Sequence, residues 1–366
     1  NKSKEKSNRE ILGCLGNKIY AAIWRRHMDI AFCLHISLAY GGGGEKWVIT
    51  VANALRRKGH SIQIHALPYA PNGRKVLKMQ ETLIGDIRYY EGWNHVVNAD
   101  VAYVFYNPLT YVFFRARCPK IAGIHSQIYF LPKTPPITYG IPAISARLLY
   151  KIIGQADMSL FNAVHVVNKF DVKHRKVYCI PDFVNTSTYE PKSEKKDKFT
   201  VLFVGRPNWQ KGWDIFLKTA AIFRKENADV EFLWVGGYDQ KIQKIVNCLG
   251  YISDECELSK IYSAAHVTLL PSRADIFGIT ILESLACGTP VITTPITSHR
   301  TLDLPLLYGN SAYDFVEIIK QLRSLWLNEP DTFLKISCEA RSMAKKYDIL
   351  NLIPKIEAMF IETAKA

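Results

Sequence analysis

Residues 201–236 contain the clearest pattern of secondary structure in this chain, VLFVGRPNWQKGWDIFLKTAAIFRKENADVEFLWVG. It begins with an apolar run of strand character, passes through a turn that contains glycines and cations, and continues into a helix predicted over 213–225. A second apolar run, 230–236, ends the stretch. This succession of strand, turn, helix and strand is the opening unit of a doubly wound parallel sheet, and runs that are apolar throughout predict strands buried on both faces.

The first half of the chain begins in the same way. The apolar run IAFCLHI (30–36) is followed by a glycine turn (41–44), a helix predicted over 45–58 and the run SIQIHAL (61–67). The sequence therefore predicts an α/β protein with two Rossmann-like, doubly wound domains that face each other across a cleft. Ligands of such sheets bind beyond the carboxyl ends of the strands, so the cleft is the expected site. Strands are predicted at Asp29–Ile36, Ser61–Leu67, Val101–Tyr106, Lys120–His125, Ala163–Val167, Val177–Ile180, Phe199–Val204, Glu231–Val235, His266–Leu270 and Pro290–Thr293.

The length of 366 residues suits two domains, and a polar stretch marks their junction. This stretch, NTSTYEPKSEKKDK (185–198), has the composition of an inter-domain linker. The expected divisions are a basic extension over 1–28, an N-terminal domain over 29–185, a linker over 186–198, a C-terminal domain over 199–345 and a final helix over 346–366.

Composition limits the classes of function. Hydrophobic residues make up 48% of the chain and charged residues 22%, which excludes a disordered, collagen-like or coiled-coil protein. No apolar run is long enough for a membrane span or a secretory signal. Eight cysteines without a C-x-x-C pair predict reduced thiols in a cytoplasmic protein. The net charge of +14 favours anionic partners, but no recognition-helix, RNP or zinc pattern accompanies it, so nucleic acid is not expected.

Two turns could hold phosphate groups. Glycines 41–44 would let backbone N–H groups approach a phosphate at a helix N-terminus, although a merely flexible turn has the same composition. The turn matches neither a P-loop nor G-x-G-x-x-G, so a nicotinamide cofactor is not expected. In the second half, Arg206 follows Gly205 and Lys211 precedes the helix. These two cations could offset a diphosphate, or they could be a pair of solvated surface cations.

The segment PSRADIFGITILESLACGTPVI, residues 271–292, carries the most chemistry. Asp275 and Gly278 lie in a loop before a helix predicted to run from about Ile279 to Cys287. Gly278 would expose N–H groups at the start of that helix, again an arrangement suited to phosphate. Glu283 lies among apolar neighbours, so its carboxylate needs hydrogen-bond donors, and sugar hydroxyls are suitable ones. The alternative is a glutamate on the helix surface.

With these segments, the sequence resembles the retaining GT-B glycosyltransferases of family 4, glycosyl transferases group 1. The resemblance covers most of residues 29–295 and is most specific in the C-terminal half. It rests on the segments GGGGE (41–45), CIPDFVNTSTYEP (179–191), GRPNWQKG (205–212), LGYISDECELSKIYSAAHVTLLPSR (249–273) and DIFGITILESLACGTPVI (275–292).

The resemblance implies a UDP- or GDP-linked sugar as donor, held mainly by the C-terminal domain, with the acceptor on the N-terminal domain. It also implies that the final helix returns to the N-terminal domain. It assigns the catalytic positions to His125 at the donor sugar, Arg206 and Lys211 at the diphosphate, Asp275 at the sugar and Glu283 at the ribose. The other donor-binding positions that it implies are Gly42, Gly43, Gly205, Tyr251, Ile252, Phe277, Gly278 and Ile279.

The implied reaction keeps the anomeric configuration of the sugar. Because Arg206 and Lys211 can offset the charge of the leaving diphosphate, no metal or other cofactor is expected. The family's first glutamate is replaced by Asp275, and the loop 297–301 departs from the family pattern. Two alternatives stay open: an NDP-sugar 2-epimerase of the same architecture, which the cations and Glu283 argue against, and a degenerate, non-catalytic binding subunit.

Two basic stretches suggest a membrane-associated acceptor. Residues 1–26 carry a net charge of +5 and repeat apolar side chains every four residues from Ile11 to Ile23. A basic amphipathic helix can lie on an anionic membrane, although it could also pack on its own domain. A second basic and apolar stretch spans 144–176. We therefore expect a lipid-linked or glycolipid acceptor and peripheral contact with the cytoplasmic face of a membrane.

Overall fold

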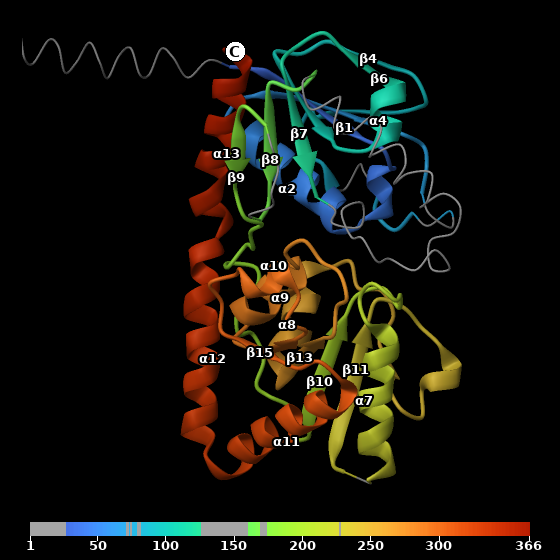
Figure 1. Ribbon diagram of the computed structural model, residues 1–366, viewed down its shortest axis with the longest axis vertical. Helices are drawn as coiled ribbons and strands as arrows, with labels where there is room; N and C mark the ends of the chain where they lie inside the picture. The colour runs from blue at the N-terminus through green and yellow to red at the C-terminus, as the bar shows by residue number, and fades with distance from the viewer. Residues whose placement is uncertain are drawn as a thin grey trace, which may run out of the picture.

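The computed structural model describes residues 27–70, 73, 75–78, 82–125, 160–168, 174–226 and 228–366. Each half of the chain forms one large parallel sheet, with the N-terminal half in the upper part of Figure 1 and the C-terminal half in the lower part. Each sheet separates two clusters of buried apolar side chains. The two doubly wound domains expected from the repeated unit are therefore present.

The N-terminal sheet has seven strands in the order β3-β2-β1-β5-β7-β8-β9, and every neighbouring pair is parallel. Alternate side chains of β1 enter different cores, with Ile30 and Phe32 on one face and Ala31 and Cys33 on the other. The strands are β1 (Asp29–Leu34), β2 (Ser61–Ala66), β3 (Arg88–Glu91), β5 (Val101–Phe105), β7 (Lys120–Ile124), β8 (Ala163–Val166) and β9 (Val177–Cys179), with a separate pair formed by β4 (His95–Val97) and β6 (Phe114–Ala116).

The C-terminal sheet has six parallel strands in the order β12-β11-β10-β13-β14-β15. Its central strand β10 is almost continuously apolar and buried, as the sequence predicts for a strand covered on both faces. The strands are β10 (Phe199–Val204), β11 (Val230–Val235), β12 (Asn247–Cys248), β13 (Val267–Leu270), β14 (Val291–Thr293) and β15 (Leu306–Tyr308).

Helices connect the strands and cover the sheets. The first helix of each domain follows a glycine turn, and α7 begins after Gly212, whose φ of 69° requires a residue without a Cβ. The helices are η1 (Leu38–Tyr40), α2 (Gly43–Arg57), α4 (Pro108–Phe113), α7 (Trp213–Lys225), η5 (Gln240–Ile242), α8 (Glu255–Ala264), α9 (Ile279–Ala286), α10 (Thr297–Arg300), α11 (Ala312–Asn328), α12 (Pro330–Ala344), η6 (Lys345–Tyr347) and α13 (Ile349–Ala364).

The last two helices run along both domains (Figure 1). Helix α12 packs on α9, and the short turn η6 joins it to α13. Helix α13 buries its apolar face in the N-terminal core, where the rings of Phe360 and Phe32 lie 5.7 Å apart. The chain passes between the domains twice, near residues 184–186 and near residues 347–348, and hydrogen bonds join the two passages. Val184 N–H donates to Tyr347 O at 3.0 Å, and Thr186 N–H donates to the Asp348 carboxylate at 3.0 Å.

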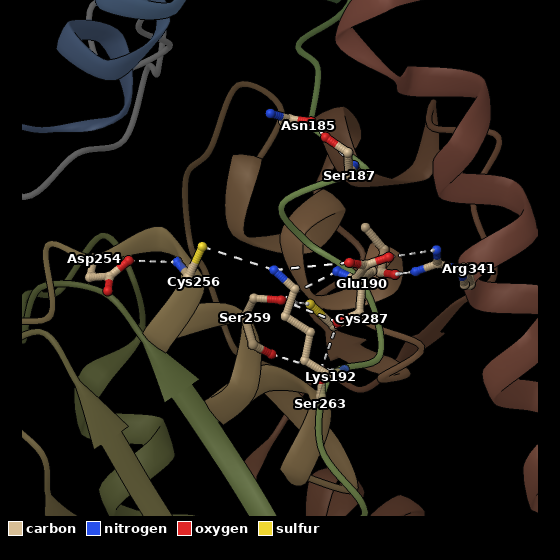
Figure 2. Close-up of polar contacts among 11 residues, drawn as sticks. Asn185, Ser187, Glu190, Lys192, Asp254, Cys256, Ser259, Ser263, Cys287 and Arg341 are labelled. Carbon is tan, nitrogen blue, oxygen red and sulfur yellow. Dashed lines mark hydrogen bonds and ion pairs between the residues drawn. The ribbon is translucent and has the colours of Figure 1, made fainter. Parts of the chain in front are cut away.

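The polar stretch 185–198 is docked on the C-terminal domain along much of its length (Figure 2). The carbonyl of Glu190 accepts hydrogen bonds from the hydroxyls of Ser259 and Ser263, at 3.2 and 2.9 Å. Lys192 N–H donates to the Ser263 hydroxyl at 3.1 Å, and the half-buried Lys195 donates to Ala265 O at 2.5 Å. The polar groups of this stretch therefore make specific hydrogen bonds to the C-terminal domain.

The structure confirms the predicted strands and corrects several boundaries. A 3₁₀ turn, η1, separates β1 from the glycines, and α2 begins at Gly43 rather than Glu45. Helix α9 ends at Ala286, one residue before the predicted end. The short strands β3, β4, β6, β12 and β15 were not predicted, because two to four residues give too little periodicity. The amphipathic stretch 1–26 and most of 144–176 lie outside the described residues.

Candidate functional site

A cleft of about 340 Å³ opens between the carboxyl ends of the two sheets. The structure brings every site residue predicted from the sequence into its lining: Gly42, Gly43, His125, Gly205, Arg206, Lys211, Tyr251, Ile252, Asp275, Phe277, Gly278, Ile279 and Glu283. The glycine turn of one domain reaches the first turn of α9 in the other, since a Cβ on Gly43 would lie 3.6 Å from Ile279 Cδ1. The two domains therefore share one site.

The turn after β10 presents two cations to the cleft. Lys211 Nζ lies 2.5 Å from the Asp275 carboxylate, with both side chains largely buried. Arg206 is exposed, donates a hydrogen bond to the Tyr40 hydroxyl of the N-terminal domain, and has its guanidinium carbon 5.1 Å from the centre of the Tyr40 ring. The turn packs against the loop after β13, where a Cβ on Gly212 would overlap the Pro271 carbonyl. Lys211 is therefore held by its own domain, whereas the contact described for the Arg206 side chain comes from Tyr40 across the cleft.

The Asp275 loop is fixed by the segment that departs from the family pattern. Ser298 donates to the Asp275 carbonyl at 2.6 Å, and Asn168 of the N-terminal domain donates to Ser298 O at 2.9 Å. Burial alone would raise the pKa of the Asp275 carboxyl, but Lys211, and more weakly His299, bring it below its ordinary value. Asp275 is therefore ionised at neutral pH, and the loop 297–301 positions it.

Glu283 is buried, and a protein group already satisfies one of its oxygens. The Tyr262 hydroxyl donates to Glu283 Oε2 at 2.8 Å. The sequence predicted that this carboxylate needs donors but did not identify Tyr262. Tyr251 and Ile252, in the loop before α8, are half-buried and line the same cleft. A ligand that reaches Glu283 would therefore complete a partly formed hydrogen-bond set.

The glycine turn carries an internal carboxylate. Glu45 is buried in the first turn of α2, and a Cβ on Gly42 would lie 2.5 Å from Glu45 Oε2. Burial raises the pKa of Glu45 to about 7, although hydrogen bonds from the N–H groups of Glu45 and Gly42 oppose the rise. Some of the N–H groups expected to face phosphate thus already have an acceptor. The turn's remaining role is close approach, which its lack of side chains permits.

His125 is the last member of a buried hydrogen-bond chain. Its Nε2 lies 2.6 Å from the Tyr103 hydroxyl, which lies 2.6 Å from His165 Nδ1, while His165 Nε2 lies 3.1 Å from Ile180 O. A Cβ on Gly123 would overlap the Tyr103 ring, so this glycine makes room for the chain.

The donor and the acceptor of each hydrogen bond in this series can be assigned in turn from Ile180 O. A carbonyl oxygen only accepts, so His165 Nε2 carries the proton and its Nδ1 accepts from Tyr103. The Tyr103 oxygen must then accept from His125 Nε2–H. Burial lowers the pKa of His125 well below its ordinary value and that of His165 to about 4, so both rings are neutral. The cleft histidine therefore keeps a lone pair on Nδ1.

The cleft contains residues that the sequence did not predict. Tyr40, Lys46, Asp182 and Gln210 also line it. His165, a polar side chain inside the apolar run AVHV, was a signal that could have been used. Tyr40 and Asp182 gave no comparable signal, because their role depends on how the two domains face each other.

The described part of the chain was compared with the requirements of a metal site and of a membrane-spanning helix. It contains no group of three or more His, Cys, Asp or Glu side chains arranged to hold a metal ion. Among its helices, none combines the length and the apolarity needed to cross a bilayer.

Residues 198–323 match the family model described as Glycosyl transferases group 1. The D-inositol 3-phosphate glycosyltransferase of Paenarthrobacter aurescens is 27% identical over 176 residues, which are 42% of this chain and 41% of that protein. The chain thus matches less than half the length of that relative. The alpha-galactosylglucosyldiacylglycerol synthase of Streptococcus pneumoniae is 24% identical over 265 residues, 62% of this chain and 67% of that protein.

A solved structure resembles nearly the whole molecule. The complex of Anabaena HepE with UDP and glucose has a TM-score of 0.67 at 14% identity, over 91% of this chain and 99% of that one. At this identity the likeness concerns the fold. The GT-B fold predicted from the sequence is confirmed, and the predicted resemblance to group 1 glycosyltransferases is confirmed over residues 198–323.

Proposed function

We propose that this protein is a retaining glycosyltransferase that uses a nucleotide-diphospho-sugar, with UDP as the first candidate nucleotide. One observation carries the proposal: Arg206 and Lys211 face the glycine turn and the N-terminus of α9 in a single cleft. Two cations, backbone N–H groups and a helix N-terminus together are suited to a diphosphate. The HepE complex with UDP and glucose, which has the same fold, supports this choice of ligand.

The proposed reaction breaks the bond between the anomeric carbon and the phosphate oxygen and forms one to an acceptor hydroxyl on the same face. The acceptor proton passes to the departing diphosphate. Arg206 and Lys211 would stabilise the charge that develops on the diphosphate, which is often the largest contribution to catalysis. Since these cations can offset that charge, we propose that the reaction needs no metal. Closure of the cleft would exclude water and favour transfer over hydrolysis.

Glu283 and the loop with Tyr251 and Ile252 would hold the nucleoside, because they line the same cleft as the two cations. His125 and Asp275 would contact the donor sugar. Phe277, Gly278 and Ile279 would supply backbone groups toward the phosphates. The 2-epimerase and non-catalytic alternatives are not favoured by the similar proteins, which are named as glycosyltransferases and synthases.

For the acceptor we propose a lipid-linked or glycolipid molecule at a membrane surface on the cytoplasmic side. The net charge of +14 suits an anionic surface, and one similar protein is named as an alpha-galactosylglucosyldiacylglycerol synthase. Transfer from the donor sugar to glucosyldiacylglycerol in anionic vesicles, compared with free inositol phosphate, would test this choice. Transfer to inositol phosphate alone would contradict it.

The test of the donor site is calorimetric titration with UDP, GDP and ADP. We expect one nucleotide to bind selectively and Lys211→Ala to weaken that binding by about 10- to 100-fold, because a hydrogen bond to a charged group contributes about 1.5–3 kcal/mol. Lys335→Ala removes the same charge from an exposed position on α12 and should leave the affinity unchanged.

Loss of Lys211 leaves Asp275 as an unpaired buried carboxylate, which is destabilising. The double variant Lys211→Ala/Asp275→Asn removes that charge and separates a binding defect from unfolding. Absence of binding by all three nucleotides to the wild-type protein would refute the proposed function. Unchanged affinity in Lys211→Ala would refute the role given to Lys211.

A further inference from the structure

Asp182 is a buried carboxylate in the cleft to which the proposed reaction assigns no role. It lies between β9 and the docked linker and lines the cleft together with His125 and Asp275. The residue is 7% exposed, and its Oδ1 has no hydrogen-bond partner among the described residues. None of the ion pairs found in the described part of the chain includes it. Within the part of the chain that the structure describes, no group donates to this buried Oδ1.

Hydrogen bonds hold the backbone on both sides of Asp182. The carbonyl of Ile180 accepts from His165 at 3.1 Å. On the other side, Val184 N–H donates to Tyr347 O at 3.0 Å. Between these anchors Phe183 is buried. Since Asp182 lines the cleft, a ligand bound there can supply the donor that the described residues do not.

Leaving such a group without a partner costs stability. Transferring a carboxylate out of water is strongly unfavourable unless hydrogen bonds or an opposite charge compensate. Burial, and secondarily the charge of Asp275, raise the pKa of Asp182 to about 7. Asp182 in turn contributes to the raised pKa of Tyr103, which donates to the ring beside His125 in the hydrogen-bond chain. The Asp182 carboxylate thus interacts with Asp275, one of the two groups assigned to the donor sugar, and with Tyr103, the hydrogen-bond partner of the other group, His125.

The groups around Asp182 indicate which kind of ligand group would donate a hydrogen bond to it. The Asp182 carboxylate and the neutral His125 ring, with its lone pair on Nδ1, both offer acceptors, whereas Arg206 and Lys211 are on the turn after β10 and Lys46 is on α2. A pair of hydrogen-bond acceptors is suited to hydroxyl groups, which can donate, rather than to a phosphate, whose oxygens accept. We propose that Asp182 binds a hydroxyl group of the donor sugar and thereby helps to select that sugar. This inference rests on the proposed function and adds a residue to it.

The test compares the affinity for UDP with that for UDP-glucose by calorimetry, or for GDP and GDP-mannose if guanine is the base selected. The ratio of the two dissociation constants measures what the sugar adds to binding. We expect Asp182→Ala to lower that contribution at least about tenfold while the affinity for the nucleotide alone changes little. Asp182→Asn should fall between, because an amide oxygen still accepts but without charge assistance.

Stability provides an independent readout. Asp182→Asn removes an uncompensated buried charge, so at pH 8 its unfolding midpoint should equal or exceed that of the wild type. Asp197→Ala, at an exposed position in the linker, is the control for a lost carboxylate and should change neither quantity.

The two proposals fail in different ways. A wild-type protein that binds no nucleotide would refute the proposed function together with this inference. Normal nucleotide binding, with the sugar contribution unchanged in Asp182→Ala, would refute this inference alone. A large loss of stability in Asp182→Asn would assign the carboxylate a structural role and would equally overturn it.

Discussion

Replacement of Gly212 by alanine should separate two loops of the cleft and destabilise the C-terminal domain. Gly212 has φ of +69°, and a Cβ built on it would lie 2.6 Å from the carbonyl carbon of Pro271 and nearer still to its oxygen. Real Cβ atoms essentially never approach another heavy atom within 3.0 Å. Because the neighbour is backbone, no side-chain rotation can relieve the overlap, so α7 and the loop after β13 must move apart.

Two costs add in this variant. The left-handed conformation costs an L-residue about 1–2 kcal/mol, and an extra atom forced into a packed site costs about 1–3 kcal/mol. We therefore expect Gly212→Ala to lower the free energy of unfolding by about 2–5 kcal/mol. The same displacement should stretch the 2.5 Å contact between Lys211 and Asp275 and weaken nucleotide binding.

Gly288→Ala is the matched control for thermal unfolding. Gly288 lies in the same domain at φ +71°, but the nearest atoms to its Cβ position are at 3.6 Å, which is ordinary contact. Gly288→Ala therefore has the same backbone strain but no steric overlap. The unfolding temperature of Gly212→Ala should lie below that of Gly288→Ala by about 2–4 °C for each kcal/mol that the overlap costs. Equal midpoints for the two variants, with unchanged nucleotide affinity in Gly212→Ala, would refute the reasoning.

Two further predictions concern titratable groups. Tyr103→Phe should lower the rate of transfer about tenfold and leave nucleotide affinity unchanged, because it removes the hydrogen bond that orients His125; an unchanged His125 tautomer by NMR and an unchanged rate would contradict this. The pKa of Glu45 is about 7 in the folded protein against an ordinary 4.5, so its contribution to stability is complete below pH 4.5 and is lost as pH rises through 7. Denaturation at pH 5 and pH 8 should therefore show a smaller decline for Glu45→Gln than for the wild type, and equal declines would contradict the assignment.

The fold and much of the site could be predicted because their signals are local in the sequence. Arg206 and Lys211 follow an apolar strand and precede a helix, so their place at the carboxyl edge of a sheet follows from the order of elements. Glu283 among apolar neighbours predicted a buried carboxylate, which the structure confirms at 6% exposure. These residues could be identified without knowing the packing of the two domains.

The residues that were missed depend on contacts between distant segments. Tyr40 reaches Arg206 across 166 positions of sequence, and no pattern within either segment indicates the pair. Tyr103 lies in the buried strand β5, where a pattern of apolar residues makes it one more core aromatic. Only Gly123, which leaves space for its ring, and the two histidines beside its hydroxyl show that it orients His125.

The two places where the chain passes between domains have a mechanical consequence. The two passages, at 184–186 and at 347–349, are hydrogen-bonded to each other, so a rotation of one domain on the other would be centred near this junction. Helix α12 packs on the lower domain of Figure 1 and α13 on the upper one. The 3₁₀ turn at Lys345–Tyr347 separates these two helices beside the junction. A continuous helix would resist such a rotation, whereas this break would let the width of the cleft change while both domains keep their shape.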